Sequence, residues 1–482
     1  MTSNLPRSMP EEQGLSSSAL LEFLAAAKAQ NLELHSLMLL RHGQVIAEGW
    51  WKPYAPELPH MLFSLSKSFT SSAIGLLVDQ GKLSVEDAVI SFFSKDLPLT
   101  ISPNLAAMKI KHLLMMASGH REDPTDSSIH NSQNWVKTIL AQPIDFEPGT
   151  HFLYNSGATF LLSAIVQHIT GATLLEFVKP RLLEPLGIEN ATWSSNAQGI
   201  NFGAWGLNLK TEDIAKFGQL YLQKGVWNNQ RILSEAWVDD ASSFQISNGE
   251  KPTSDWQQGY GYQFWRCQHG AYRGDGAFGQ YCVVMPEQDA VIAITSAVSD
   301  MQVVLDLVWE YLLPNMNSGV VTTNQSDLEK LQESLSNLEL QVVEGEKTSI
   351  NAARVSGLNY EFEPNQAKIQ SINLNFLAHH LELKVKNDSG EHVLLCGYGH
   401  WLANETFFEP TTGFKNLELQ KVSLQGAWVR ADAFELKLCF DESTFTFTFL
   451  FEFSGQDLQL HSSVNVGFGE TTYNPMLAKV IA

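Results

Sequence analysis

The chain has 482 residues, of which 44% are hydrophobic and 17% charged, and its formal net charge at pH 7 is −21. This length suits two or three domains with large apolar cores, and the acidic balance argues against general electrostatic binding to nucleic acid or anionic lipid. The sequence shows neither a signal-peptide pattern at its start nor an uncharged apolar run of about 18 residues. We therefore expect no membrane partner and a cytoplasmic location.

The cysteines and histidines give no sign of a metal or cofactor site. The four cysteines form no C-x-x-C pair and are too few for a disulfide scaffold. We expect small buried thiols in a reducing compartment, with a bridge between Cys267 and Cys282 left open as the alternative. His112, His120 and the histidines near the C-terminus lack metal-ligand spacing, so we interpret them as structural.

The first elements along the chain are a helix, a hairpin and a buried helix. Residues 16–30 begin with serines that suit an N-cap and continue with leucine and phenylalanine at helical spacing, which predicts a helix. Two β-rich runs within 36–51 flank His42-Gly43 and predict a hairpin. Residues 64–80 are apolar and rich in small side chains, a pattern typical of a buried helix.

The middle of the chain is mostly helical in pattern. Helical character runs from about 82 to 222, and a strand pattern returns in three runs within 259–297, beginning with 259–267. A helix is predicted over 301–314. Strands at both ends with helices between them predict an α+β domain over 1–314, built on one antiparallel sheet.

The composition changes near residue 315. A polar, turn-rich stretch predicts a linker with one short helix over 315–344. From about 345 onward, six runs alternate apolar and polar residues with period two, including one over 416–429. They predict an all-β domain over 345–482, a sandwich or barrel for which a lipocalin-like barrel is one candidate.

The strongest short motif pairs Ser64 with Lys67. The two residues stand three apart at a helix start, so their side chains share one face. A serine hydroxyl is a weak nucleophile until a base takes its proton, and a lysine can be that base when burial lowers its pKa. Amides at the helix N-terminus favour a developing oxyanion. The alternative is a surface lysine after a serine N-cap, but the following helix has a buried pattern.

Two further motifs lie downstream. Tyr154-Asn155-Ser156-Gly157 follows a turn and precedes an apolar helix, so it can supply a phenol and hydrogen-bond donors to a cleft. Residues 274–281 read G-D-G-A-F-G-Q-Y on a strand pattern, where glycines let a ligand or another backbone come close. Alone, the tyrosine also fits a packed turn, and the glycines fit a bulge or tight crossing.

In order and spacing, the three motifs together resemble those of the serine β-lactamase and penicillin-binding protein superfamily, whose signature is S-x-x-K. The class C branch, with its esterase and D-amino-acid peptidase relatives, is the most similar. The resemblance covers about residues 10–314 and extends to these stretches: 60–81, 110–119, 146–171, 183–187 and 206–222.

The resemblance implies roles for individual residues. Ser64 would be the nucleophile, Lys67 its base partner and Tyr154 a participant in proton transfer. The backbone N–H groups of Ser64 and Ala277 would form the oxyanion hole. The resemblance also implies five substrate-binding positions: Asn155, Ser156, Gly274, Asp275 and Gly276.

The third motif departs from the family pattern. Where relatives have Lys-Thr-Gly, or His or Trp before Gly, this chain has Gly274-Asp275-Gly276, so the cation that helps bind a β-lactam carboxylate is missing. Arg273 is expected to point to the opposite face by the strand period. In the second motif, Ser156 falls where the family often has Asn, and an exchange of order with Asn155 stays open.

We therefore expect a serine hydrolase that forms an acyl-enzyme at Ser64 with a small ester, amide or peptide, without a cofactor. An esterase or a small-peptide or D-amino-acid amidase is favoured over a β-lactamase. Two alternatives stay open: a β-lactamase or penicillin-binding protein with weak turnover, and a non-catalytic binding protein on the same fold. The altered third motif supports the second alternative, and the retained Ser64, Lys67 and Tyr154 oppose it. Homo-oligomerisation stays open, as does the role of the C-terminal domain, which would restrict substrate access or mediate assembly.

Overall fold

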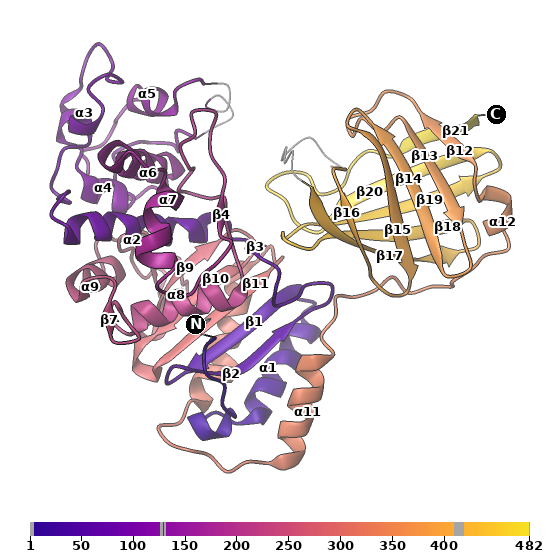
Figure 1. Cartoon of the computed structure of the whole chain (residues 1–482), viewed down its shortest axis with the longest axis horizontal. Coiled ribbons are helices and arrows are strands. Elements are labelled where there is room, and N and C mark those ends of the chain that lie inside the picture. The colour runs from indigo at the N-terminus through magenta and orange to yellow at the C-terminus, as the bar shows by residue number, and fades with distance from the viewer. Residues whose placement is uncertain (1–3, 126–128, 130–131, 409–418, 482) are drawn as a thin grey trace.

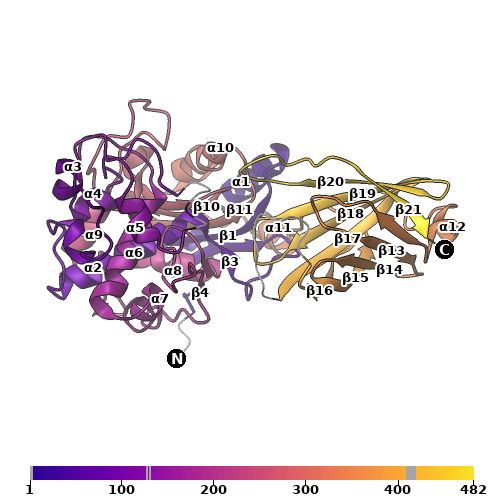
Figure 2. The ribbon, with the colours of Figure 1, turned by 90° about the horizontal axis from the view of Figure 1, so that it is seen from above.

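A computed structural model describes residues 4–125, 129, 132–408 and 419–481, which form an α+β domain followed by a β-barrel (Figure 1). Seen from above, the two domains lie side by side along the long axis of the molecule (Figure 2).

The first domain is built on a six-stranded antiparallel sheet. Its hairpin turns at His42 and Gly43, both in the left-handed region (φ 49° and 74°). The N-terminal hairpin pairs with strands that come about 240 residues later, so the chain closes on itself as predicted. In spatial order the strands are β2 (Gln44–Trp50), β1 (Leu34–Arg41), β11 (Ala290–Ser296), β10 (Gln280–Met285), β9 (Tyr272–Gly276) and β8 (Trp265–Arg266).

Helices cover both faces of this sheet, which explains why β1 is buried along its whole length. One face packs against α1 (Ser17–Ala29) and α10 (Met301–Leu307), and the other against α2 (Ser66–Asp79) and α8 (Thr211–Leu222). Ser16 caps α1 by accepting a hydrogen bond from the Ala19 amide, as its sequence predicts. The predicted helix over 301–314 continues beyond α10 as irregular helical turns to Asn315.

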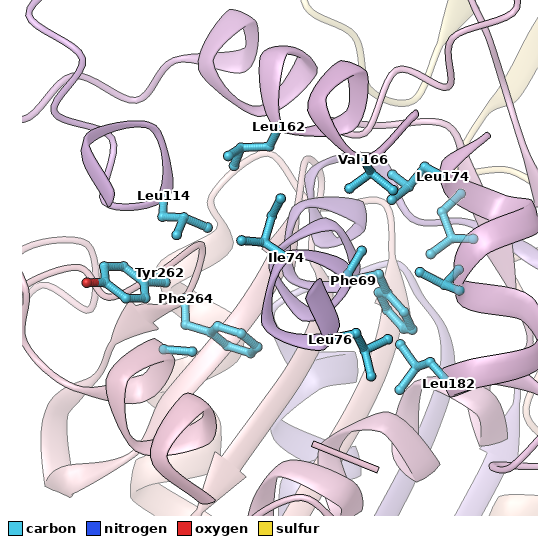
Figure 3. Packing of buried hydrophobic residues seen from close by; sticks show 14 of the residues in the cluster. Phe69, Ile74, Leu76, Leu114, Leu162, Val166, Leu174, Leu182, Tyr262 and Phe264 are labelled. Atoms are coloured by element: carbon cyan, nitrogen blue, oxygen red, sulfur yellow. The ribbon is translucent and has the colours of Figure 1, made fainter. Parts of the chain in front are cut away.

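A helical region packs around α2 at the end of the sheet. Figure 3 shows its core, where Phe69 and Ile74 of α2 meet Leu162 and Val166 of α6. The remaining elements of this domain are β3 (His60–Met61), α3 (Pro103–Ala107), α4 (Ile110–Leu114), α5 (Trp135–Leu140), α6 (Ser156–Thr170), α7 (Leu174–Val178), β4 (Thr192–Trp193), β5 (Leu207–Leu209), β6 (Val226–Trp227), β7 (Gln230–Arg231) and α9 (Glu235–Ser242).

The predicted strand over 259–267 is wrong for most of its length, because only Trp265–Arg266 forms one. Gln263 adopts a left-handed backbone (φ 65°), and its buried side chain donates to the carbonyls of Leu113 and Leu114 at 3.1 and 2.8 Å. Ser68 donates to the Gln263 carbonyl at 2.8 Å. Most of this apolar run therefore contacts helices, and only its last part adds the edge strand β8 to the sheet.

The stretch predicted as a linker packs on the first domain. Its helix, α11 (Gln325–Ser336), lies beside α1 and β2, with Leu331 buried between them (Figure 1). Beyond α11, the segment that leads to the barrel pairs with the backbone of Lys52. The Lys52 amide donates to the Leu338 carbonyl at 3.0 Å, and the Lys52 carbonyl accepts from the Leu340 amide at 2.8 Å.

The second domain is a β-barrel in which neighbouring strands are antiparallel except at the closure. Nine strands form a ring that closes where β15 pairs in parallel with β17, and β16 pairs with the same edge of β17. Three strands were not predicted from period two, namely β12, β16 and β21, and part of the run over 416–429 lies outside the described residues. The barrel elements are α12 (Ala352–Val355), β12 (Asn359–Phe362), β13 (Ser371–Phe376), β14 (His380–Asn387), β15 (Gly390–Tyr398), β16 (Leu402–Thr406), β17 (Gln420–Arg430), β18 (Ala433–Phe440), β19 (Thr446–Ser454), β20 (Asp457–Val464) and β21 (Met476–Ile481).

All four cysteines are free and buried, and Cys267 and Cys282 belong to the cores on opposite faces of the sheet, which rules out the alternative bridge. Within the described residues, no single helix has the length and apolarity to cross a membrane. The bent pair Ser156–Thr170 with Leu174–Leu183 meets that test by length and composition only.

Gly276 allows β9 to cross the turn before α2 at close range. A Cβ atom at this position would lie 2.0 Å from the Leu62 carbonyl oxygen and 3.2 Å from the Leu65 amide nitrogen. We predict that Gly276→Ala lowers the free energy of unfolding by about 1–3 kcal/mol, because backbone must shift to admit the methyl group. Chemical denaturation of the full chain measures this. Gly469→Ala, whose Cβ would meet open space, is the matched control, and equal stability of the two variants would contradict the crowding.

Candidate active site

Ser64 and Lys67 lie next to each other where a short 3₁₀ turn (Phe63–Leu65) leads into α2. Lys67 Nζ is 3.0 Å from Ser64 Oγ and donates to the Ala204 carbonyl at 3.0 Å. Ser64 is half-buried, whereas Lys67 is only 1% exposed. A partly accessible hydroxyl therefore sits on a buried amine, which is the arrangement a nucleophile and its base require.

The surroundings of Lys67 favour its neutral form. Burial lowers the pKa of Lys67 from 10.5 to about 7, while the carboxylates of Asp123 and Asp275 act in the opposite direction. A large share of the amine is then unprotonated near neutral pH, and it can accept the proton of Ser64.

Tyr154 lies just before α6 and completes this group. Its hydroxyl is hydrogen-bonded to Ser64, and its ring centroid is 4.8 Å from Lys67 Nζ. The ring stacks on Trp265 with centroids 5.2 Å apart, which fixes its orientation. Burial raises the pKa of Tyr154 above its ordinary value, so the phenol keeps its proton at neutral pH and is available as a proton donor.

The structure distinguishes Asn155 from Ser156. Asn155 is fully buried and caps α6, since its Oδ1 accepts from the Ala158 amide at 2.8 Å and its Nδ2 donates to Ser118 at 3.1 Å. The capping role of Asn155 accounts for its position without a substrate, and its substrate contact stays a prediction. Ser156 is half-buried, with Oγ 3.4 Å from Lys67 Nζ, and it takes the position beside the nucleophile.

Asp123 is a site residue that the sequence motifs did not single out. Its carboxylate accepts hydrogen bonds from the amides of Ser156 and Gly157 at 2.8 and 3.3 Å, at the N-terminus of α6. It also contributes the larger of the two carboxylate effects on the pKa of Lys67. Asp123 stands 33 residues before Ser156, so no local spacing could reveal the contact.

The third motif supplies close packing and a buried ion pair. A Cβ atom at Gly274 would lie 2.4 Å from Ser68 Oγ, so Gly274 and Gly276 make room for α2 and the turn before it, and their contact with a substrate stays a prediction. Arg273 points away from Gly274, as expected, but the same period of two puts it beside Asp275. Arg273 Nε donates to Asp275 at 2.9 Å with both side chains buried, so the guanidinium pairs with the acid on the side of the strand away from Gly274.

Ala277 directly follows β9 and is half-buried, next to Gly276, which lies against the turn from Leu62 to Leu65 that contains Ser64. The residues beside the two predicted oxyanion donors share an unusual backbone conformation. Phe63, before Ser64, has φ 47°, and Phe278, after Ala277, has φ 65°. Aromatic residues rarely adopt these angles, so both turns are strained.

Comparison with known proteins relates the first domain to one family. A family model described as Beta-lactamase matches residues 25–308. A 6-aminohexanoate-dimer hydrolase from Paenarthrobacter ureafaciens is 25% identical over 287 residues, which cover 55% of this chain and 73% of that protein. Lovastatin esterase from Penicillium rubens is 28% identical over 153 residues, covering 27% of this chain and 38% of the esterase.

A solved structure extends the likeness in fold to both domains. The octameric penicillin-binding protein homologue from Pyrococcus abyssi superposes with a TM-score of 0.50 at 16% identity, covering 96% of this chain and 99% of that one.

The lowered pKa of Lys67 predicts how the reactivity of Ser64 depends on pH. The rate of Ser64 modification by a fluorophosphonate should rise with pH through a midpoint near 7, because only the neutral amine accepts the serine proton. Lys67→Ala should lower this rate by about a hundredfold to ten-thousandfold and remove the midpoint. Labelling rates measured from pH 5 to 9 test both expectations. A rate still rising at pH 9 would contradict the lowered pKa of Lys67, and a Lys67→Ala variant that keeps the wild-type rate and midpoint would show that Lys67 is not the base.

Proposed function

Since the chain belongs to the beta-lactamase family, we propose that it is a serine hydrolase that forms an acyl-enzyme at Ser64 from a small ester or amide. The observation that carries the proposal is the 3.0 Å contact between Ser64 Oγ and the buried Lys67 Nζ, whose pKa is lowered to about 7. Burying a charged ammonium group costs free energy, so the buried position of Lys67 favours the neutral amine that the reaction requires.

In the proposed reaction, Ser64 Oγ bonds to the carbonyl carbon of the substrate and its proton passes to the neutral Lys67 amine. The carbonyl oxygen becomes an oxyanion that accepts hydrogen bonds from the amides of Ser64 and Ala277. The bond to the leaving alcohol or amine then breaks, and that group takes a proton delivered through the Tyr154 phenol. Water hydrolyses the resulting ester of Ser64 by the same steps in reverse, restoring the serine.

Two observations favour neutral or amine-bearing esters and amides over β-lactams. Gly274 occupies the position where relatives place a cation, and a side chain there would collide with Ser68. Asp123 adds a carboxylate beside Lys67, whereas the charge of Asp275 is balanced by Arg273. One similar protein is a hydrolase of a 6-aminohexanoate dimer and another an esterase, which supports the same reaction class here.

The lipocalin-like identity of the barrel stays a prediction, and we also propose that the barrel does not act as a carrier of small molecules. Its interior is filled by aromatic and aliphatic side chains, among them Trp428, Phe434, Phe449 and Phe451. The four buried, free cysteines fit the proposed cytoplasmic location.

The proposal predicts that Ser64 is the residue acylated. Treatment with a fluorophosphonate, followed by peptide mass spectrometry, should place the adduct on Ser64, and Ser64→Ala should abolish both labelling and turnover of p-nitrophenyl esters. Ser66 lies in the same peptide and is the internal control, because its hydroxyl is buried and donates to the Phe63 carbonyl at 2.6 Å. An adduct on Ser66, or ester turnover by Ser64→Ala, would refute the assignment.

The charge pattern predicts a substrate order. We expect kcat/KM for nitrocefin, which carries a carboxylate, to be at least about fivefold below that for p-nitrophenyl acetate, since one unfavourable charge interaction at 4 Å costs about 1 kcal/mol in water. Added salt should narrow the gap by screening. If nitrocefin is hydrolysed as efficiently as the ester, the chain is better described as a β-lactamase.

A further inference from the structure

The two turns that carry the proposed oxyanion donors are both held from outside their own domain. Phe63 and Phe278 flank Ser64 and Ala277, and both have left-handed backbone angles that a bulky residue keeps only where its surroundings impose them. Their rings meet edge to face, with centroids 5.5 Å apart.

Two phenylalanines from the barrel pack on this pair. Phe445, at the end of the β18–β19 turn, lies 6.2 Å from the rings of both Phe63 and Phe278. Phe468, in the connection between β20 and β21, lies 6.1 Å from Phe63 and 4.9 Å from Phe278. Buried Val466 belongs to the same apolar cluster. Each strained residue therefore contacts two aromatic rings of the second domain.

Hydrogen bonds from the same barrel turn reach both strained segments. Thr444 Oγ1 donates to the Ser296 carbonyl at 2.7 Å, and Ser296 Oγ lies 2.8 Å from the Phe278 carbonyl oxygen. On the other side, the Met61 amide donates to the Glu442 carbonyl at 3.0 Å, three residues before Ser64. Residues 442–445 thus link the two turns to one rigid element of the barrel.

We propose that the barrel is a positioning part of the hydrolase site. Phe445, Phe468 and Thr444 hold the backbone at Phe63 and Phe278 so that the amides of Ser64 and Ala277 point at the same oxyanion. This inference rests on the proposed function for its catalytic consequence, although the restraint on the two turns is independent of it. These three residues position other groups and need not touch the substrate.

A restraint on oxyanion donors has a specific kinetic signature. Such donors act more strongly on the transition state than on the bound substrate, so loosening them lowers kcat and leaves KM nearly unchanged. Removal of a single donor costs about a hundredfold to a thousandfold in kcat, so loosening both turns should cost about tenfold to a hundredfold.

The test uses the full chain with Phe445→Ala, Phe468→Ala and the double variant. Phe468 is 73% exposed, so its truncation removes little barrel core. Phe407→Ala, a half-exposed barrel phenylalanine outside the cluster, is the matched control. Hydrogen–deuterium exchange should become faster in peptides covering 60–66 and 274–280, unchanged in α6 and β14, and kcat for p-nitrophenyl acetate should fall about tenfold or more at constant KM.

Unchanged exchange at both turns together with unchanged kcat would overturn the proposal. If exchange rises throughout the barrel, the phenylalanine substitution has unfolded the barrel. The Thr444→Val variant then decides, because this change removes the hydrogen bond to Ser296 and leaves the aromatic rings in place. Wild-type exchange at 274–280 in that variant also overturns the proposal. Turnover that does not require Ser64 would refute the proposed function instead, while the exchange data would still decide the positioning role.

Discussion

The burial of Lys67 beneath Ser64 is the constraint around which the site is arranged. An ammonium group removed from water is costly, so burial alone favours the neutral amine. Asp123 and Asp275 act against this effect and keep the pKa of Lys67 near 7. Without the two carboxylates, the pKa of Lys67 would fall further and its amine would be a weaker base. With an unpaired carboxylate in direct contact, Lys67 would instead keep its positive charge. Arg273 offsets part of the charge of Asp275, so the ion pair on β9 helps to set the basicity of Lys67.

The same burial requires the sheet to come unusually close to the start of α2. Gly274 and Gly276 alternate with Arg273 and Asp275 on β9, so one side of the strand is bare and the other carries the ion pair. The bare side lets the turn at Ala277 lie against the turn at Ser64. A cation in place of Gly274 would therefore disturb the packing that supports Lys67. The glycine that replaces the lysine of the Lys-Thr-Gly pattern thus allows β9 to pack closely against α2.

Local patterns were sufficient for the parts of the site that are close in sequence. Ser64 and Lys67 are one helical turn apart, and the period of a strand correctly separated Arg273 from Gly274. The sequence did not reveal Asp123, because its partner amides at Ser156 and Gly157 depend on how a loop folds back on α6. The cap formed by Asn155 could not be distinguished from a substrate contact in the sequence, since both require the same residue type at a helix start. The turn at Gln263 ended the predicted strand over 259–267 through side-chain bonds to helices distant in sequence.

The contacts between the domains are the hardest to predict from the sequence, since Phe63 and Phe468 are some 400 residues apart. The free energy of these contacts can be compared with the strain of the two turns. A residue held in a disfavoured backbone region costs about 1–3 kcal/mol. A favourable aromatic pair contributes about 0.5–1.5 kcal/mol beyond the area it buries. The four pairs that join Phe63 and Phe278 to the barrel rings can therefore offset the strain of both turns, but with little to spare. The proposed positioning role therefore requires these aromatic pairs to stay in place if the amides of Ser64 and Ala277 are to remain aligned.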